Sequence, residues 1–497
     1  MKHLIFTLLC ASASVLSLRA QDTLRLSLQS AIATAVEHSI ESKVAKNQLL
    51  SAYWAYRTYQ REMLPVLTFD GMLPEYSQSL NLLQHPDGTT HYVNSNFNRF
   101  NAGLSLTQNI PWTGATLSVS TTHEQLQQFG DNPFTRYRTT PLSVILNQPL
   151  FAFNSLRWLQ KTEPLRYHAA LKQAVINQEE VALRVISYYF ALLSEEINLE
   201  IARQNMENAQ RLYTIAEARH RMGQLPNVEL MQMRSSLLRA EITLTNTQYA
   251  LENRMFNLRS FLGLGEGVII LPIIPELTAE SIPHLNFNEV LELAQENNPF
   301  TENVQRSLIE ADRDVRRAKA NRWNASLYAA FGVSGQSPEF RAAYQSNLWD
   351  NDQIVRLGIR VPILDWGRNK GQVKMAEAHR EIAYALAERD NLDFVQDAYL
   401  RVQNFNNQPR QLELAKYMDE IAQERYKTSV ELYVFEKIDI LNLNDAERAK
   451  DEARRGYISE MFLLWSYYYQ IRTLTLYDFV NDSPVALVYD FREMVGE

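Results

Sequence analysis

The chain has 497 residues, a formal net charge of −8 and 46% hydrophobic residues. This acidic balance gives no electrostatic footprint for nucleic acid, so a nucleic-acid partner is not predicted. The only cysteine is Cys10, which excludes a disulfide framework, and stability is expected to come from packing.

The N-terminus predicts export. Lys2 stands ahead of an apolar stretch at residues 4–18, which is a secretory signal peptide in length and order. Cleavage after residues 1–20 would remove Lys2 and Arg19 and no acidic residue, taking the formal charge from −8 to −10. Cys10 lies within the apolar stretch, where a lipobox would want a small residue ahead of it, so an unlipidated N-terminus is favoured.

The mature chain contains two copies of one module. Residues 143–157 reappear 213 positions later as residues 356–370, and each copy reads as strand, break and helix. Upstream, a helix start at Leu26 matches another at Leu285. Two copies of helix, strands and long helical hairpin indicate a duplicated module, because a solenoid needs at least three repeats.

This pattern predicts a division of the chain into five segments. They are the signal peptide (1–20), a first repeat (21–262, with strands in 66–150 and a hairpin at 155–261), a connector (263–284), a second repeat (285–480, with strands in 326–364 and a hairpin at 368–474) and a tail (481–497).

The predicted strands alternate between apolar and polar residues. The segment VRLGIRVPI places Val355 and Leu357 on one face and Arg356 and Arg360 on the other. A half-buried sheet in a soluble sandwich fits this pattern as well as a membrane barrel does. The predicted signal peptide favours the barrel, which would put both arginines in the lumen. The alternative for the arginines is an ordinary solvated strand face.

The two copies differ in length. Leu26 to Pro149 spans 123 positions, whereas Leu285 to Pro362 spans 77, so the first copy carries about 46 extra residues. These fit an added β-hairpin at residues 103–124 that turns at Pro111-Trp112-Thr113-Gly114.

The helices carry most of the chain. Residues 156–222 form a helical pattern of roughly 100 Å, which is interrupted only by Pro164 near its start and is too long for a globular core. A turn leads to a returning helix at 227–261, and the second copy repeats this at 369–432 and 437–474. Pro409 should split or kink the third of these helices. Apolar residues at helical spacing within the helices predict core packing rather than a ligand site.

Several motifs resemble those of the TolC-type outer-membrane efflux proteins. They are the paired NQPLF and RVPIL, the stretch VALRVISYYFALL, and the hairpin ends MGQLPNVELMQM and LYVFEKIDILNLNDA. The resemblance covers nearly the whole mature chain. It implies a mainly α fold with a membrane β-barrel portion, in which a homotrimer builds one β-barrel and one periplasmic α-barrel. It also implies outer-membrane lipid, a periplasmic adaptor protein and an inner-membrane pump as partners.

The sequence departs from the family in two places. The insertion of about 46 residues leaves open whether each protomer contributes four strands to the barrel. The second hairpin tip also lacks a glycine where Gly223 stands in the first.

The resemblance implies a gate at the periplasmic entrance, where the family has acidic residues just past the hairpin turn. Matching the motifs gives Asp439 and Asn442, with Glu229 and Gln232 in the first copy. A ring of carboxylates near a water-filled axis favours cations. The alternative is that Asp439 and Glu229 lie in the first turn of a helix, where the macrodipole favours acidic side chains.

Nothing in the sequence supports catalysis. The glycines at 263, 265 and 267 lack the later glycine and helix of a dinucleotide site, and the histidines show no metal-binding spacing. We therefore predict no enzyme activity, cofactor or metal, and a passive efflux channel in the outer membrane that extends into the periplasm. The alternatives are the outer-membrane component of type I protein secretion and a secreted coiled-coil scaffold without a pore.

Overall fold

The structure, a computed structural model, describes residues 23–488 apart from residues 85–87, 131–132, 266, 276–281, 323, 346, 348, 361–362 and 436. The predicted signal peptide, Cys10 and Pro362 lie outside the described part. The chain forms two compact units, one from residues 1–50, 170–299 and 392–497 and the other from residues 51–169 and 300–391. Because each unit combines segments of both predicted repeats, the division into repeats and connector stays a prediction.

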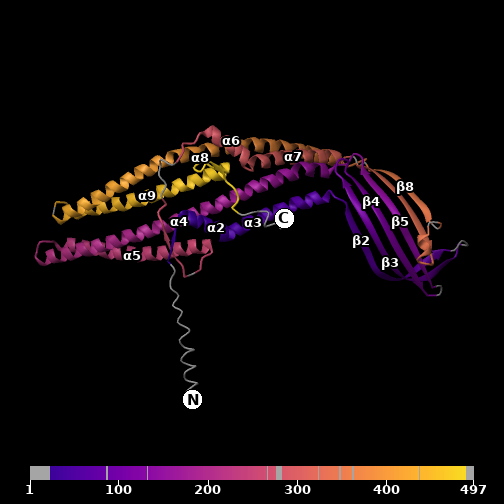
Figure 1. Ribbon diagram of the computed structural model, residues 1–497, viewed down its shortest axis with the longest axis horizontal. Coiled ribbons are helices and arrows are strands. Elements are labelled where there is room, and N and C mark those ends of the chain that lie inside the picture. The colour runs from indigo at the N-terminus through magenta and orange to yellow at the C-terminus, as the bar shows by residue number, and fades with distance from the viewer. Residues whose placement is uncertain are drawn as a thin grey trace, which may run out of the picture. The chain divides into compact units, whose positions relative to one another are not determined.

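Four long helices form two hairpins (Figure 1). Helix α4 (Ser155–Arg221) is followed by α5 (Asn227–Leu262), and α8 (Arg368–Val434) by α9 (Ile440–Thr475). α4 and α8 have 67 residues each, and α5 and α9 have 36 each. The second hairpin therefore starts 213 positions after the first, at 368 against 155, with every boundary kept. The predicted duplication is confirmed at the level of these helices.

Pro409 does not split the third long helix, so the expected break was wrong. α8 is continuous through it. The neighbouring side chains Phe405 and Leu412 are buried in the core. Gln408 Nε2 also donates to the Glu460 carbonyl oxygen of α9 at 3.0 Å. Packing against α9 therefore holds the helix together despite the one backbone hydrogen bond that proline removes.

Shorter elements complete the first unit. β1 (Thr23–Leu26) pairs in parallel with β6 (Ile269–Pro272). The other elements, some of which continue into the second unit, are α2 (Leu28–His38), α3 (Ile40–Glu62), α6 (Phe287–Asn297), β9 (Tyr477–Asp478) and β10 (Ser483–Pro484). Ser27 caps α2 by accepting from Ser30 N–H, and Asn286 caps α6. These caps begin the two matching helices that were predicted after Leu26 and Leu285.

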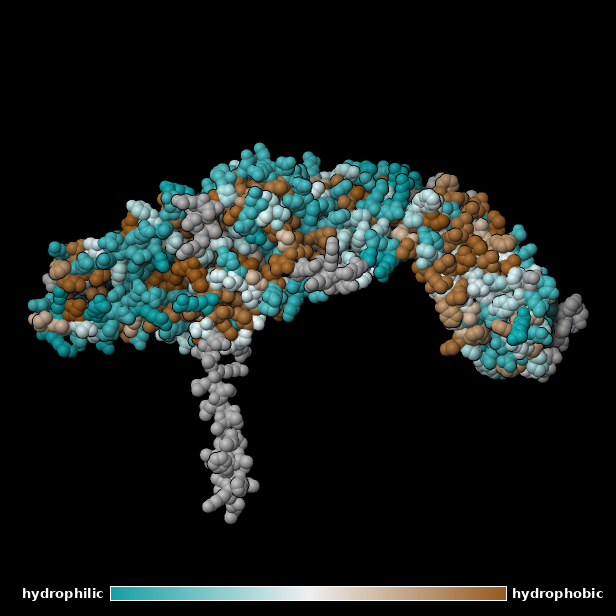
Figure 2. Space-filling view, viewed as in Figure 1, coloured by the Kyte–Doolittle hydropathy of each residue, from teal (hydrophilic) through white to brown (hydrophobic). Residues whose placement is uncertain are grey.

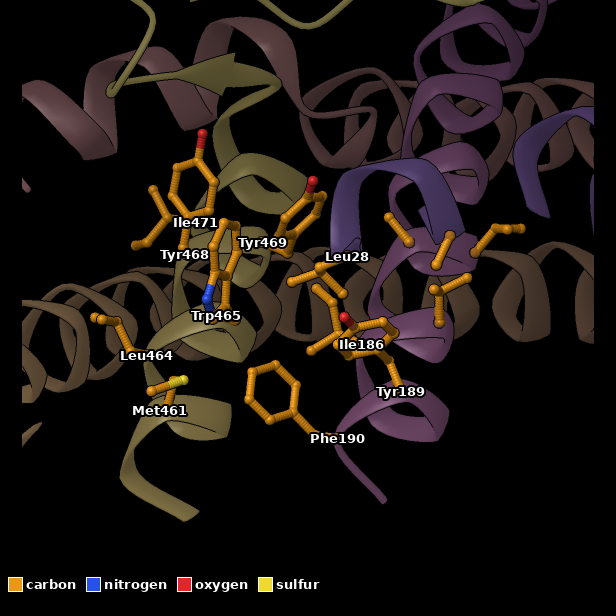
Figure 3. Packing of buried hydrophobic residues seen from close by; sticks show 14 of the residues in the cluster. Leu28, Ile186, Tyr189, Phe190, Met461, Leu464, Trp465, Tyr468, Tyr469 and Ile471 are labelled. Carbon is orange, nitrogen blue, oxygen red and sulfur yellow. The ribbon is translucent and has the colours of Figure 1, made fainter. Parts of the chain in front are cut away.

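The core of the first unit lies between α4 and α9. Figure 3 shows Phe190 of α4 facing Met461 and Trp465 of α9. Tyr189 is fully buried, and its hydroxyl lies 2.8 Å from the Leu26 carbonyl oxygen and accepts from Ile273 N–H at 2.8 Å. Each large apolar side chain buried in this way stabilises the fold by about 1.5–3 kcal/mol. Tyr189 also ties the strand pair of β1 and β6 to the core.

The second unit contains a six-stranded antiparallel sheet with the order β2-β3-β4-β5-β7-β8. Its strands are β2 (Val66–Gln84), β3 (Thr90–Ile110), β4 (Ala115–Phe129), β5 (Phe134–Pro149), β7 (Asn324–Ser337) and β8 (Trp349–Arg360). Helix α7 (Phe300–Ala320) precedes β7, and the short helix η2 (Ala342–Tyr344) lies between β7 and β8. The predicted hairpin at 103–124 is part of the β3–β4 pair. The chain thus contributes six strands to this sheet, which explains the extra length of the first copy.

Candidate functional site

The ends of the two helical hairpins lie next to each other in the first unit. Burial raises the pKa of Tyr433 on α8; the charge of Arg219 on α4 lowers it in part, and that of Glu229 on α5 raises it further. The first turn needs glycine because Gly223 has a φ of 68°. In the second turn Lys437 N–H donates to the Leu432 carbonyl oxygen at 2.9 Å. The predicted gate residues follow these two turns.

Asp439 is the N-cap residue of α9. Its Oδ1 accepts from the backbone N–H of Asn442 at 2.9 Å and from Asn442 Nδ2 at 2.8 Å. The carboxylate therefore satisfies one of the N–H groups that a helix start leaves without an intrahelical partner. Glu229 lies in the first turn of α5. The structure brings Asp439 and Asn442 into direct contact, in the helix-start role that was the alternative to a gate.

The structure matches the residues of the two hairpin tips differently from the sequence analysis, which set Glu229 and Gln232 against Asp439 and Asn442. The N-cap of α5 is Pro226, which makes no side-chain capping bond, and the N-cap of α9 is Asp439. Asn442 is thus equivalent to Glu229, and Gln232 corresponds to Asp445. The sequence analysis overlooked Asp445, whose Oδ2 lies 2.7 Å from an Arg425 nitrogen of α8. Applying the 213-residue repeat to Gln232 would have identified it.

Gln232 lies in a polar groove between α4, α5 and α9. The groove encloses about 770 Å³, and Leu441, Glu447 and Asp451 of α9 also line it. Burial and the charge of Asp451 raise the pKa of Glu447, while Lys450 lowers it in part. The groove just behind the hairpin tips is therefore lined by charged side chains of both signs, because Arg239, Arg448 and Arg455 line it as well.

A buried network joins α4 to α9 beside this groove. Asn205 Nδ2 donates to Asp451 Oδ2 at 2.8 Å, and Lys450 Nζ donates to Asn205 Oδ1 at 3.3 Å. Lys450 also forms an ion pair with Asp451 at 3.2 Å and lies 4.4 Å from the centre of the Tyr426 ring. These contacts fix the distance between the hairpins.

A second charged cluster lies at the other end of α9. Arg472 forms ion pairs with Glu179 of α4 at 2.9 Å and with Asp478 at 3.3 Å. Burial raises the pKa of Glu179, and the Arg472 charge offsets this only in part. The pKa of Asp478 is lowered, because hydrogen bonds from Tyr468 and Asn481 outweigh the effect of its burial. The sequence analysis missed this cluster, since its members lie up to 299 positions apart.

The sheet has two chemically different faces. One row of paired residues is polar and contains Asn109, Thr116, Asn147, Tyr328 and Arg356. The next row is apolar on four strands, at Leu117, Leu146, Ala329 and Val355, and continues to Gln108 on β3. Because successive side chains point to opposite faces, Arg356 lies on the polar face and Val355 on the apolar one. Arg360 pairs with Asn324, and its side chain lies outside the described part.

Further rows repeat this alternation. An apolar row runs across five strands through Leu67, Leu106, Val119, Val144 and Phe331. The adjacent row contains Thr68, Ser105, Ser120, Ser143, Gly332 and Asp352. Figure 2 shows hydrophobic side chains gathered on the sheet near the strand ends that join the helices, and hydrophilic ones toward the opposite ends.

Among the described residues, no helix is both long enough and apolar enough to cross a membrane. No group of three or more histidine, cysteine, aspartate or glutamate side chains in the described ranges could hold a metal ion.

Comparisons with known proteins connect this architecture to one family. Residues 110–264 match the family described as "Outer membrane efflux protein". No curated protein matches the sequence.

Several solved outer-membrane channels share the fold. The chain aligns with CusC at 17% identity and a TM-score of 0.61, over 90% of this chain and 91% of that one. It aligns with the OprN channel at 17% identity and a TM-score of 0.62, over 90% and 89%. It aligns with CmeC of Campylobacter jejuni at 14% identity and a TM-score of 0.63, over 94% of this chain and 88% of that one.

The fold is therefore that of these channels, with long helical hairpins and an antiparallel sheet. Residues 110–264 are thus similar to the outer membrane efflux protein family, and the fold of the whole chain is similar to that of solved outer-membrane channels. Both similarities agree with the outer-membrane efflux channel that the sequence analysis predicted.

Proposed function

We propose that this protein is the outer-membrane conduit of a tripartite efflux system. It passes small molecules passively from a periplasmic adaptor and an inner-membrane pump to the outside. The observation that carries the proposal is the sheet with one apolar and one largely polar face. Such a sheet can separate lipid from water, with Arg356 on the face that contacts water.

Aromatic side chains support this placement of the sheet. The exposed Trp112, Phe151 and Trp366 lie at the strand ends that join the helices. Tyr137, on the other side of the apolar band, contacts Phe340 at 5.7 Å between ring centres. Strand β7 runs eleven residues from the level of Pro149 to that of Tyr137, roughly 36 Å along the strand. A tilt of roughly 35–45° reduces this to about 25–30 Å, close to the height of a barrel's apolar band.

We propose that the protein is a homotrimer. Exposed apolar residues on α5 follow a coiled-coil spacing, through Val228, Met231, Leu238, Ile242, Tyr249 and Phe256. Exposed apolar residues also run along α8, through Leu414, Tyr417, Met418 and Ile421. Exposing an apolar stripe of this length to water is unfavourable in free energy, so we expect neighbouring copies of the chain to bury it.

We propose that the hairpin tips form the periplasmic entrance. Threefold repetition would bring Asp439, Asn442, Glu229 and Gln232 into rings around the axis, where carboxylates favour cations. Exposed apolar side chains surround both turns, at Met222, Val228, Met231, Val434, Phe435 and Leu441. They offer the adaptor an apolar docking surface.

Planar bilayers test the proposed function. Detergent-purified protein should run as a trimer and give stepwise single-channel currents. Leu238→Gln/Ile242→Gln should reduce the trimer fraction, because it makes the α5 stripe polar. The matched control is Arg234→Gln/Glu241→Gln on the exposed polar side of α5, which should leave the trimer intact. Folded trimers that give no current would identify the chain as a pore-less scaffold instead.

A further inference from the structure

The sheet ends in two strands that each have one unpaired side. In the described part of the chain, β2 and β8 each pair with a single neighbour, β3 and β7 respectively. The apolar face of the sheet places these sides in lipid, where unpaired backbone N–H and C=O groups cost several kcal/mol each. Both sides therefore need a partner strand.

We propose that β8 of one copy pairs with β2 of the next copy, so that three copies close a barrel of eighteen strands. The proposal rests on the proposed function and identifies the surfaces that join the copies. With six strands per chain, the barrel would be about one and a half times as wide as one built from four strands per chain.

Strand direction and face orientation fit this closure. Because the six strands alternate in direction, β2 and β8 run in opposite directions and can pair as antiparallel neighbours. Each copy offers two different surfaces, so the contact is head-to-tail and closes into a ring. The pairing must also keep the apolar faces continuous, which restricts the register to steps of two residues.

The strand ends select one register. Within one copy, the row of paired residues that starts at Arg356 on β8 ends at Asn109 on β3. Asn109 lies beyond Thr107, which pairs with Val66 at the start of β2. A closure without stagger would leave the end of β8 facing the segment that precedes β2. A stagger of about six residues per copy instead sets Arg360 opposite Val66, and it gives the strands a tilt of roughly 35°, within the range of barrels.

The irregularity in β2 limits the pairing to the membrane part. The ladder with β3 shifts between Met72 and Glu75, around Pro74. Proline has no N–H to donate, and a bulge turns an edge away from further pairing. In the staggered register Met72 faces Ile354, so the paired segments are Val66–Met72 and Ile354–Arg360.

The same register brings opposite charges together. Asp70 pairs with Gly103, two positions from Thr68, and therefore lies on the polar face. Arg356 lies on the polar face of β8. At the stagger that aligns the strand ends, Asp70 of one copy stands opposite Arg356 of the next, and opposite charges directly across a strand pair stabilise it.

Cysteine pairs test the register. The mature chain is predicted to have no cysteine, so Asp70→Cys/Arg356→Cys introduces the only two thiols. Mild oxidation of the detergent-solubilised protein should convert most of it to covalent dimers and trimers that reductant returns to monomers. Asp70→Cys/Asp350→Cys, the pair expected without stagger, is the control and should stay monomeric on the gel.

Other cross-links would overturn the proposal. Ser120→Cys/Arg356→Cys, which keeps the same tilt, tests a twelve-strand barrel in which β4 is the joining edge, and covalent trimers from that pair would refute eighteen strands. Trimers of Asp70→Cys/Arg356→Cys that conduct but do not cross-link would also refute the eighteen-strand barrel. That result would leave the proposed channel function unaffected. If the cysteine variants fail to fold, Asp70→Arg and Arg356→Asp should each lower the melting temperature of the trimer, and the double exchange should restore it. A double exchange no better than the single variants would refute the pairing.

Discussion

Arg472 on α9 forms an ion pair with Glu179 on α4, with Nε 2.9 Å from Oε2 and only 16% and 4% of the two side chains exposed. The pair joins the first and last long helices across the core of the first unit. Asp478 also contacts Arg472, at 3.3 Å, so one guanidinium serves two carboxylates. Removing the arginine would leave two buried acids without their counter-ion.

We expect Arg472→Met to destabilise the protein by about 3–5 kcal/mol, because an uncompensated buried charge costs that much. Glu179→Leu/Arg472→Met should recover part of the loss, since an apolar pair replaces an ionic one at modest cost. Tryptophan fluorescence during urea unfolding in detergent measures both. The control is Arg410→Met, which breaks an exposed pair with Glu413 and should cost less than about 1 kcal/mol. Equal losses at Arg472 and Arg410 would contradict the prediction.

The buried carboxyl group of Glu447 predicts that the stability of the protein depends on pH. Burial and Asp451 raise its pKa above that of the unfolded chain, with Lys450 offsetting part of the rise. Its contribution to stability is therefore complete below the unfolded pKa and is lost as the pH rises through the folded pKa. We expect Glu447→Gln to unfold at a higher temperature than the wild type near about pH 8, and to lose this advantage near about pH 4.

Scanning fluorimetry across this pH range measures the effect. Glu241→Gln, at an exposed position of α5, is the matched control and should show no pH-dependent difference from the wild type. A Glu447→Gln variant that is less stable at every pH would mean that the carboxylate holds the groove together, and would refute the prediction.

Gly335 lets the segment between β7 and β8 lie against the sheet. A Cβ at this position would come within 2.6 Å of the Ala343 carbonyl oxygen, which accepts a hydrogen bond from Thr139 Oγ1 at 2.8 Å. We therefore expect Gly335→Ala to displace η2 and to speed trypsin cleavage after the exposed Arg341 severalfold. In Gly358→Ala, the control on β8, the new Cβ would meet its nearest atom, Ser326 Oγ, at an ordinary 3.6 Å. Unchanged cleavage in Gly335→Ala would show that η2 adapts to the methyl group.

Local patterns were enough to predict the long helices and one hairpin. The glycine and proline around the first turn fixed the end of α4 and the start of α5 to within a residue, because both residues have strong conformational preferences. The Pro409 break was wrong because the contact of Gln408 with α9 outweighs a local preference. The pairing of β1 with β6 and the cluster around Arg472 depend on partners hundreds of positions away, which no local pattern encodes.

The hairpin tips show that prediction from the sequence is limited in the same way for the candidate site. Sequence spacing located Asp439 and Asn442 near a helix start, but only the backbone shows that Asp439 is the N-cap and that Pro226 is its counterpart. The capping bond gives Asp439 a structural role whether or not it also forms a gate. A test of the gate must therefore change the charge and keep the cap.

Asp439→Asn meets this requirement, because asparagine caps a helix about as well as aspartate and carries no charge. If Asp439 lines the entrance, three carboxylates converge near the axis, where bound cations or hydrogen bonds must offset their repulsion. We expect Asp439→Asn to reduce block by divalent cations in planar bilayers and to leave the unfolding temperature unchanged. Asp439→Ala should show the same loss of block together with about 1 kcal/mol less stability, since it also removes the cap. Glu229→Gln, in the first turn of α5, is the comparison for the first tip and should have the smaller effect on block. If divalent block is the same in the wild type and Asp439→Asn while Asp439→Ala loses stability, then Asp439 serves only to start α9 and the entrance is narrowed elsewhere.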